Sequence, residues 1–266
     1  MDAALASRLA ASVRAADPDR YFSALFAPAA ARPFLFALYA FNAETARVAE
    51  TVREPMLGAI RLEWWRETAE GAARATPRNH DVARGLAALF ETHRLALADF
   101  EAMIATRAFD SSADRHADFT ALETYLDATG GTVMRLAIRI LGGDAGQARA
   151  AALAYGLTGL LRSLAFHNGR HKLYLPLDLL SAVGLTPEEF FILRHDQRVD
   201  AVAHQVALRA QDHFADARKA RPGTALAALL PAALVPLYLR RLGTPRDVPV
   251  HRRQMALLSA AMRKRL

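Results

Sequence analysis

The chain has no cysteine among its 266 residues. Without thiols it can form neither a disulfide framework nor a thiolate metal site. Long apolar runs are also scarce. The nearest approach is residues 222–239, which are 18 residues without a charge but contain Pro222, Pro231 and Pro236. Because a membrane-spanning helix needs about 20 apolar residues, we expect a kinked, buried helix there.

The N-terminal stretch MDAALASRLAASVRAADPDR lacks the apolar segment of a secretory signal. Its arginine, alanine and serine content is typical of a transit peptide, but Asp2, Asp17 and Asp19 argue against that interpretation. We expect these residues to form a first amphipathic helix of the folded protein.

Acidic residues are fewer than basic ones, which gives a formal net charge of +7 and an isoelectric point near 10.2. Such an excess favours anionic partners: nucleic acid, a membrane surface or a diphosphate-like ligand. The chain shows no zinc-finger, RNP or basic-zipper pattern. We therefore expect no nucleic-acid partner.

Strand-like alternation is missing, and apolar residues recur three or four positions apart, as they do in helices. Clear breaks punctuate this pattern. Gly142-Gly143 ends one helix before the N-cap Asp144, and Thr186-Pro187-Glu188-Glu189 forms a capping box. The sequence predicts a single all-α domain over residues 1–266, with about ten helices joined by short loops.

Two carboxylates and an arginine lie close together in residues 35–55. A continuous helix would place Glu50 and Glu54 four residues apart on one face, with Arg47 one turn before Glu50. Paired carboxylates can hold Mg²⁺, which binds oxygen ligands and bridges phosphates. However, Arg47 competes with a cation, and Glu54 lies at a helix end before Pro55. The residues alone favour a surface salt-bridge pattern over a metal site.

Four segments stand in the order and spacing typical of the squalene/phytoene synthase family, and the similarity is strongest over residues 20–180. The resemblance implies an isoprenoid synthase fold, a helical bundle around a deep apolar cavity. Active members join two prenyl diphosphates head to head, with Mg²⁺ held by two facing Asp-rich helical motifs. We expect Tyr39, Tyr125, Gly130 and Gly131 to line the cavity. The segments are LFAPAAARPFLFALYAF (25–41), RLEWWR (61–66), GGTV (130–133) and LTGLLR followed by YLP (157–162 and 174–176).

The first Asp-rich motif of the resemblance is degenerate in this chain. It reads Ala46-Arg47-Val48-Ala49-Glu50, so that of its key positions Ala46, Arg47 and Glu50 only the last keeps a carboxylate. Each Mg²⁺ needs several oxygen ligands. A lone carboxylate beside an arginine supplies too few.

The second motif is degenerate as well. Arg162 matches a family arginine, but Ser163 and Phe166-His167 stand where acids are expected. Losing the metals removes the charge stabilisation of the leaving diphosphate. We therefore predict no catalytic residue, no metal site and no cofactor. The alternative is an active prenyltransferase on farnesyl or geranylgeranyl diphosphate that uses Mg²⁺ and recruits Glu44, Glu50, Glu54 or Asp127.

These substitutions resemble those of a subfamily of respiratory complex I assembly factors. The resemblance implies a non-catalytic binding or assembly role with a respiratory-complex partner. It also implies a cytoplasmic location, peripheral at the inner membrane, or on the matrix side in a eukaryote. The cavity would be filled by side chains or hold an apolar, prenyl or lipid ligand.

Residues 159–176 gather cations where a helix meets a loop. One hypothesis is that these cations bind an anionic head group without metal, because arginine forks match phosphate geometry. The alternative is that they pair with acids such as Glu50 and Asp127 or lie in solvent. The proposed anion-binding set is Arg47, Arg162, His167, Arg170 and Lys172.

Residues 251–266 contain five arginine or lysine residues, no acid and an apolar centre. A basic amphipathic helix of this kind suits an anionic membrane surface. A helix packed on the bundle with solvated arginines fits the same pattern, and the sequence does not separate the two.

Overall fold

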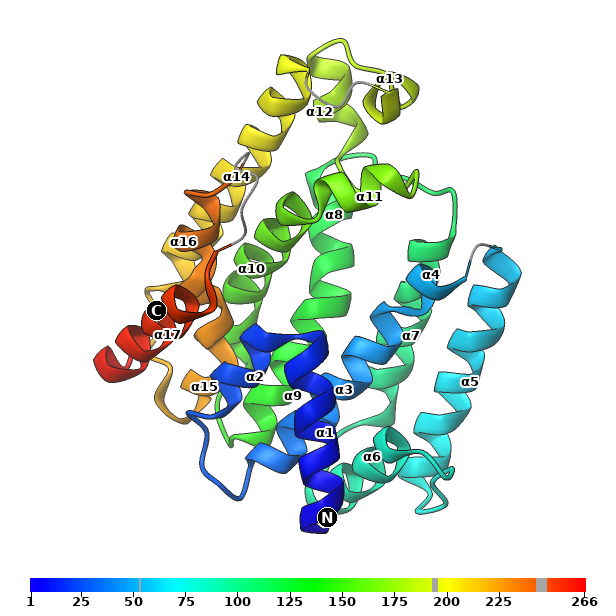
Figure 1. The fold of residues 1–266 in the computed structure, drawn as a ribbon, viewed down its shortest axis with the longest axis vertical. Coiled ribbons are helices and arrows are strands. Elements are labelled where there is room, and N and C mark those ends of the chain that lie inside the picture. Colours follow the sequence, from blue (N-terminus) through cyan, green and yellow to red (C-terminus); the bar gives the residue numbers. More distant parts are fainter. Residues whose placement is uncertain (53, 193–195, 243–247) are drawn as a thin grey trace.

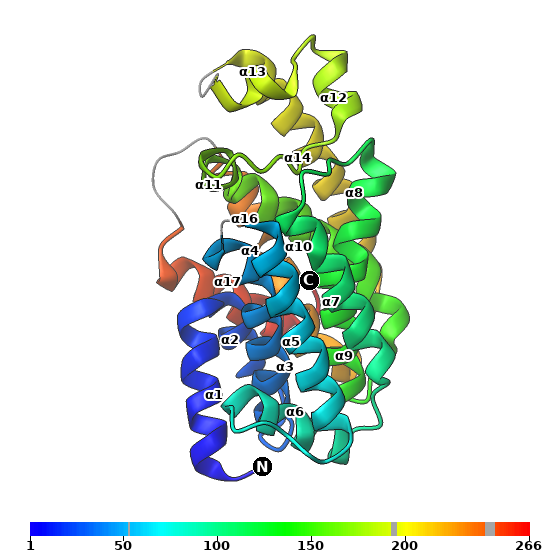
Figure 2. The same cartoon turned by 90° about the vertical axis from the view of Figure 1, so that its right-hand side faces the viewer.

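The structure is a computed structural model that describes residues 1–52, 54–192, 196–242 and 248–266. Within these ranges all regular secondary structure is helical, as predicted, and no strand occurs. The helices build an elongated bundle, with α12 and α13 at one end and α6 at the other (Figures 1 and 2).

The first half of the chain supplies one flank of the bundle. Its helices are α1 (Ala3–Ala16), α2 (Pro18–Ala24), α3 (Arg32–Ala46), α4 (Val48–Thr51), α5 (Pro55–Ala73), α6 (Asp81–Thr92), α7 (Leu97–Ser111), α8 (Phe119–Leu126), the π-helix η1 (Asp127–Gly131) and α9 (Thr132–Ile140).

The second half packs against this flank and extends beyond it. Its elements are η2 (Ala145–Gln147), α10 (Ala148–Arg162), α11 (Leu164–Gly169), α12 (Leu177–Ala182), α13 (Pro187–Ile192), α14 (Gln197–Ala217), η3 (Gly223–Ala225), α15 (Leu226–Leu229), η4 (Leu230–Leu234), α16 (Val235–Leu239) and α17 (Val250–Arg263). The chain therefore breaks into more and shorter helices than the periodicity predicts.

Local capping explains where several helices begin. The Asp2 carboxylate accepts the Leu5 N–H at 2.7 Å at the start of α1. The predicted capping box is confirmed: the Thr186 N–H donates to Glu189 at 2.9 Å, and the Glu189 N–H donates to the Thr186 hydroxyl at 3.2 Å. Each bond satisfies an N–H that a helix start leaves without a backbone partner.

The helix predicted over residues 35–55 is interrupted twice. It ends at Ala46, resumes as α4, and stops at Val52, whose backbone is extended. Pro55 opens α5, and proline disfavours helical geometry at the residue before it. The prediction that Glu50 and Glu54 share one helical face is therefore wrong, because Glu54 lies outside α4.

The prediction of a kinked, buried segment at residues 222–239 is confirmed. Pro231 and Pro236 are each the second residue of a new short element, and the segment runs as η3, α15, η4 and α16. Leu229, Leu230 and Leu234 are at most 1 % exposed. Among the described residues, no helix has both the length and the apolarity to cross a bilayer.

Two large apolar clusters hold the bundle together. One is centred on α1, α3, α6 and α9, and the other on α8, α10, α12 and α14. Where they meet, α4, the end of α7, α8 and the α10–α11 junction converge toward the upper part of the bundle (Figure 1). This convergence positions the candidate site.

Candidate functional site

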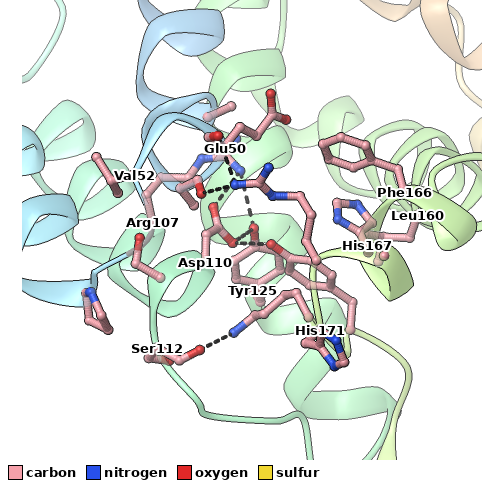
Figure 3. A pocket seen from close by; sticks show the side chains of 18 of the residues that line it. Glu50, Val52, Arg107, Asp110, Ser112, Tyr125, Leu160, Phe166, His167 and His171 are labelled. Carbon is pink, nitrogen blue, oxygen red and sulfur yellow. Dashed lines mark hydrogen bonds and ion pairs between the residues drawn. The ribbon is translucent and has the colours of Figure 1, made fainter. Parts of the chain in front are cut away.

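A pocket of about 540 Å³ opens where these elements converge. Figure 3 shows Phe166 and His167 on one side of it and Val52 and Ser112 on the other. The pocket brings positions of both degenerate motifs together. Its lining includes Ala46, Ala49, Glu50, Val52, Glu54, Arg107, Asp110, Ser111, Ser112, Tyr125, Leu160, Phe166, His167, Arg170, His171, Lys172 and Tyr174.

The pocket floor is built around Asp110, at the end of α7. Its side chain is 5 % exposed. The Tyr125 and Tyr174 hydroxyls donate to one carboxylate oxygen at 2.5 and 2.8 Å, and the Arg107 guanidinium lies 3.3 Å from the other. A buried carboxylate needs such partners to stay charged. Because three donors already occupy Asp110, it has little capacity left for a metal.

Lys172 makes hydrogen bonds within the protein at the end of α7. Its ammonium donates to the backbone carbonyls of Phe109 and Ser112 at 2.5 and 2.9 Å, and it lies 4.0 Å from the centroid of the Phe109 ring. These carbonyls end α7, where a cation satisfies free acceptors and the negative end of the helix dipole. Lys172 therefore holds the end of α7 as well as lining the pocket.

Arg170 crosses the pocket mouth. Its Nη2 donates to the backbone carbonyls of Ala49 and Glu50 at 3.1 and 2.8 Å, so it ties the loop after α11 to α4. Among the described residues, no other nitrogen of this side chain makes a hydrogen bond. Nε and Nη1 therefore remain able to bind a ligand.

Ser163 and His167 contact each other through the His167 Nε2 and the Ser163 hydroxyl, 2.9 Å apart. Since the hydroxyl already donates to the Gly159 carbonyl at 2.8 Å, we assign the histidine Nε2–H as the donor. Burial lowers the pKa of His167. The second degenerate motif thus holds a neutral Ser–His pair where the family resemblance implies carboxylates.

Arg47 and Arg162, which were expected to share the anion-binding set, lie outside this pocket. Arg47 lines a separate hollow on the other side of α4, with Trp64 and His80. Arg162, at the end of α10, turns the other way: its guanidinium lies 3.7 Å from the Tyr238 ring centroid. Of the five residues in the predicted anion-binding set, the structure therefore brings only His167, Arg170 and Lys172 together at this pocket.

Arg162 instead approaches a buried acid that the sequence did not single out. It lies 3.8 Å from the carboxylate of Asp19, whose side chain is 5 % exposed. Arg253 and the Tyr155 hydroxyl each bond this carboxylate at 3.1 Å, and the Tyr238 hydroxyl bonds it as well. This Asp19 cluster joins α2, α10, α16 and α17.

The four residues expected to line the cavity also lie in different parts of the structure. Tyr125 lines the pocket, whereas Tyr39 lies in the main core at 2 % exposure. Gly130 and Gly131 lie in η1 and do not line this pocket. A Cβ on Gly131 would collide with the Asp127 carboxylate, so this glycine makes room for an acidic side chain.

Arg107, Asp110 and Tyr174 were absent from the sequence prediction. Arg107 and Asp110 are three residues apart on α7, which is a visible pairing signal. Tyr125 and Tyr174, whose hydroxyls bond Asp110, lie 15 and 64 residues from it in the sequence. Only the fold brings these groups together.

The family resemblance implies Mg²⁺, and the oxygen donors here do not fit a metal cluster. Glu50 is the one carboxylate among Ala46, Glu50, Ser163 and His167, and the Asp110 carboxylate is already bonded. In the described part of the chain, no group of three or more histidine, aspartate or glutamate side chains could hold a metal ion. A hard divalent cation here would have to take most of its ligands from water.

The fold defines the class of protein. The structure superposes on a dehydrosqualene synthase with a TM-score of 0.81 at 15 % identity, covering 97 % of this chain and 95 % of that one. It superposes on a squalene synthase from Alicyclobacillus acidocaldarius with a TM-score of 0.73 at 18 % identity, covering 98 % and 94 %. The bundle has the isoprenoid synthase fold.

The squalene/phytoene synthase family profile matches residues 13–260, so the chain belongs to the squalene/phytoene synthase family. It is 29 % identical over 237 residues to the human NADH dehydrogenase (ubiquinone) complex I, assembly factor 6, covering 86 % of this chain and 71 % of that protein. It is 30 % identical over 199 residues to a presqualene diphosphate synthase of Rhodopseudomonas palustris, covering 72 % and 70 %.

Proposed function

We propose that this protein is a non-catalytic member of its family that acts in the assembly of respiratory complex I. Its similarity to complex I assembly factor 6 over most of the chain supports the partner. The role places it at the inner face of the respiratory membrane, on the cytoplasmic side in a bacterium or the matrix side in a mitochondrion.

The observation that carries the proposal is the set of donors at the pocket mouth. Of the positions that the family resemblance assigns to acids, only Glu50 keeps a carboxylate, and Ser163 and His167 are bonded to each other at 2.9 Å. Prenyl transfer needs the diphosphate charge to be neutralised as it leaves. The cations nearby are partly used by the protein, since Lys172 bonds carbonyls of α7 and Arg170 bonds carbonyls of α4.

We propose further that the pocket recognises a small polar or anionic head group of a lipid or prenyl ligand without metal. Arg170 would donate from Nε and Nη1, and Lys172, whose ammonium bonds the carbonyls of Phe109, Ser112 and Asp114, would add positive charge beside the same space. The protein keeps these groups in place through its own hydrogen bonds, so that binding needs little reordering of side chains.

An active prenyltransferase is the alternative, supported by the 30 % identity to presqualene diphosphate synthase. It would have to use Glu50, Glu54 or Asp110, the carboxylates that line the pocket. Glu44 and Asp127, also candidates by sequence, lie elsewhere: Glu44 lines the hollow of Arg47, and Asp127 pairs with Arg135 and Arg149.

One paired experiment separates the two functions. Deleting the gene should lower assembled complex I and NADH:ubiquinone activity in membranes, and both wild type and Glu50→Gln should restore them. The purified chain should release no diphosphate from farnesyl or geranylgeranyl diphosphate with Mg²⁺, with an active presqualene diphosphate synthase as the positive control. Normal complex I in the deletion strain, or turnover that Glu50→Gln abolishes, would contradict the proposal.

A further inference from the structure

The C-terminal helix α17 uses one face to hold onto the bundle. Arg253, with a side chain 12 % exposed, reaches Asp19, while Leu257 and Ala260 are buried. α17 packs against η4 and α2. These contacts fix the rotation of α17 about its axis. They therefore determine which residues lie on the face opposite the bundle.

That opposite face is apolar as well. Met255, Leu258 and Met262 are 62 %, 43 % and 76 % exposed. Spacings of three and four place them on a single side of a helix. We call these three residues the outer stripe. Exposed apolar side chains scattered singly are ordinary, but three in line on one helix mark an interaction surface.

The charges around the outer stripe have one sign. Arg252, Arg263, Lys264 and Arg265 are exposed, and residues 250–266 contain no aspartate or glutamate. An apolar stripe beside unopposed cations matches the interface of an anionic bilayer, where apolar side chains enter the acyl boundary and cations meet phosphates.

A second exposed apolar group lies on α5, and it differs in charge. Met56, Leu57 and Ile60 are 72 %, 47 % and 59 % exposed, but charges of both signs flank them: the exposed acids Glu54 and Glu63 and the exposed Arg61. α5 and α17 lie on opposite sides of the bundle, so one flat surface cannot touch both (Figures 1 and 2). Charge complementarity selects α17.

We propose that the outer stripe of α17 docks the protein onto an anionic lipid bilayer while the helix stays packed on the bundle through Arg253, Leu257 and Ala260. This inference deepens the proposed function at a respiratory membrane. It gives the membrane contact to one face of one helix, with the remaining bundle held above the lipid.

The test is flotation of the full chain with vesicles of phosphatidylcholine alone or mixed with phosphatidylglycerol. Wild type should float with the anionic vesicles only, and added salt should weaken binding because surface charges are screened. Met255→Gln/Leu258→Gln/Met262→Gln should bind about tenfold less or weaker still. The matched control, Met56→Gln/Leu57→Gln/Ile60→Gln, alters three exposed apolar residues on α5 and should bind like wild type.

Circular dichroism melting of both variants checks that each remains folded, as expected for exposed positions. No binding by wild type, equal binding by the folded α17 variant, or loss confined to the α5 variant would each overturn the proposal. Vesicle binding tests only the outer stripe of α17, whereas the amount of assembled complex I in the deletion strain tests the proposed function. A failure of one is therefore distinguishable from a failure of the other.

Discussion

Asp19→Asn should lower the free energy of unfolding by about 3–5 kcal/mol, the usual cost of leaving a buried ion pair without one partner. Asp19 is the carboxylate shared by Arg253, Arg162 and two tyrosine hydroxyls, and its side chain is 5 % exposed. The variant keeps the shape of the side chain and removes its charge. Urea denaturation followed by circular dichroism measures the change.

Asp216→Asn is the matched control, because Asp216 pairs with Lys219 in an exposed ion pair with side chains 58 % and 77 % exposed. Exposed pairs contribute little to stability. We expect the control to unfold like wild type. If Asp19→Asn also did, the Asp19 cluster would not hold α2, α10, α16 and α17 together.

The protein should lose stability on acidification through His116. This side chain is 4 % exposed and stacks on Phe109 with ring centroids 4.2 Å apart. Burial, reinforced by the positive charge of Lys172, lowers the pKa of His116 from 6.5 to about 4. In this interval the unfolded chain binds a proton that the folded chain refuses, so unfolding becomes easier as pH falls.

The full shift corresponds to about 3 kcal/mol, lost between pH 6.5 and about 4. Urea denaturation across this range should show a shallower pH dependence for His116→Gln than for wild type. His204→Gln, at an exposed position, should keep the wild-type slope. Equal slopes in wild type and His116→Gln would show that His116 is not kept neutral by the fold.

Much of the fold follows from local rules that the sequence displays. The apolar period predicts helices, Thr186 and Glu189 form the predicted capping box, and the prolines of residues 222–239 break a buried segment. The break between α3 and α5 was harder to foresee. One turn of α4 satisfies the same period as a continuous helix, yet it removes Glu54 from the face of Glu50.

The candidate site was predictable only where the family resemblance pairs two motifs. Glu50 and His167 do meet at one pocket, as the two motifs imply. Whether a cation faces that pocket depends on helix rotation, which sequence spacing does not determine across a break such as the one at Ser163. Arg162 therefore pairs with an acid 143 residues away in sequence, and Asp110 collects donors from α8 and the loop after α11.

The most direct test of the account is calorimetric titration of Mg²⁺ into the protein mixed with an unreactive prenyl thiodiphosphate. We predict no saturable heat beyond that of Mg²⁺ with the analogue alone, and analogue binding that EDTA leaves unchanged, because the pocket offers too few free carboxylate oxygens. Saturable Mg²⁺ binding that requires the analogue and disappears in Glu50→Gln would contradict the account and indicate a working synthase.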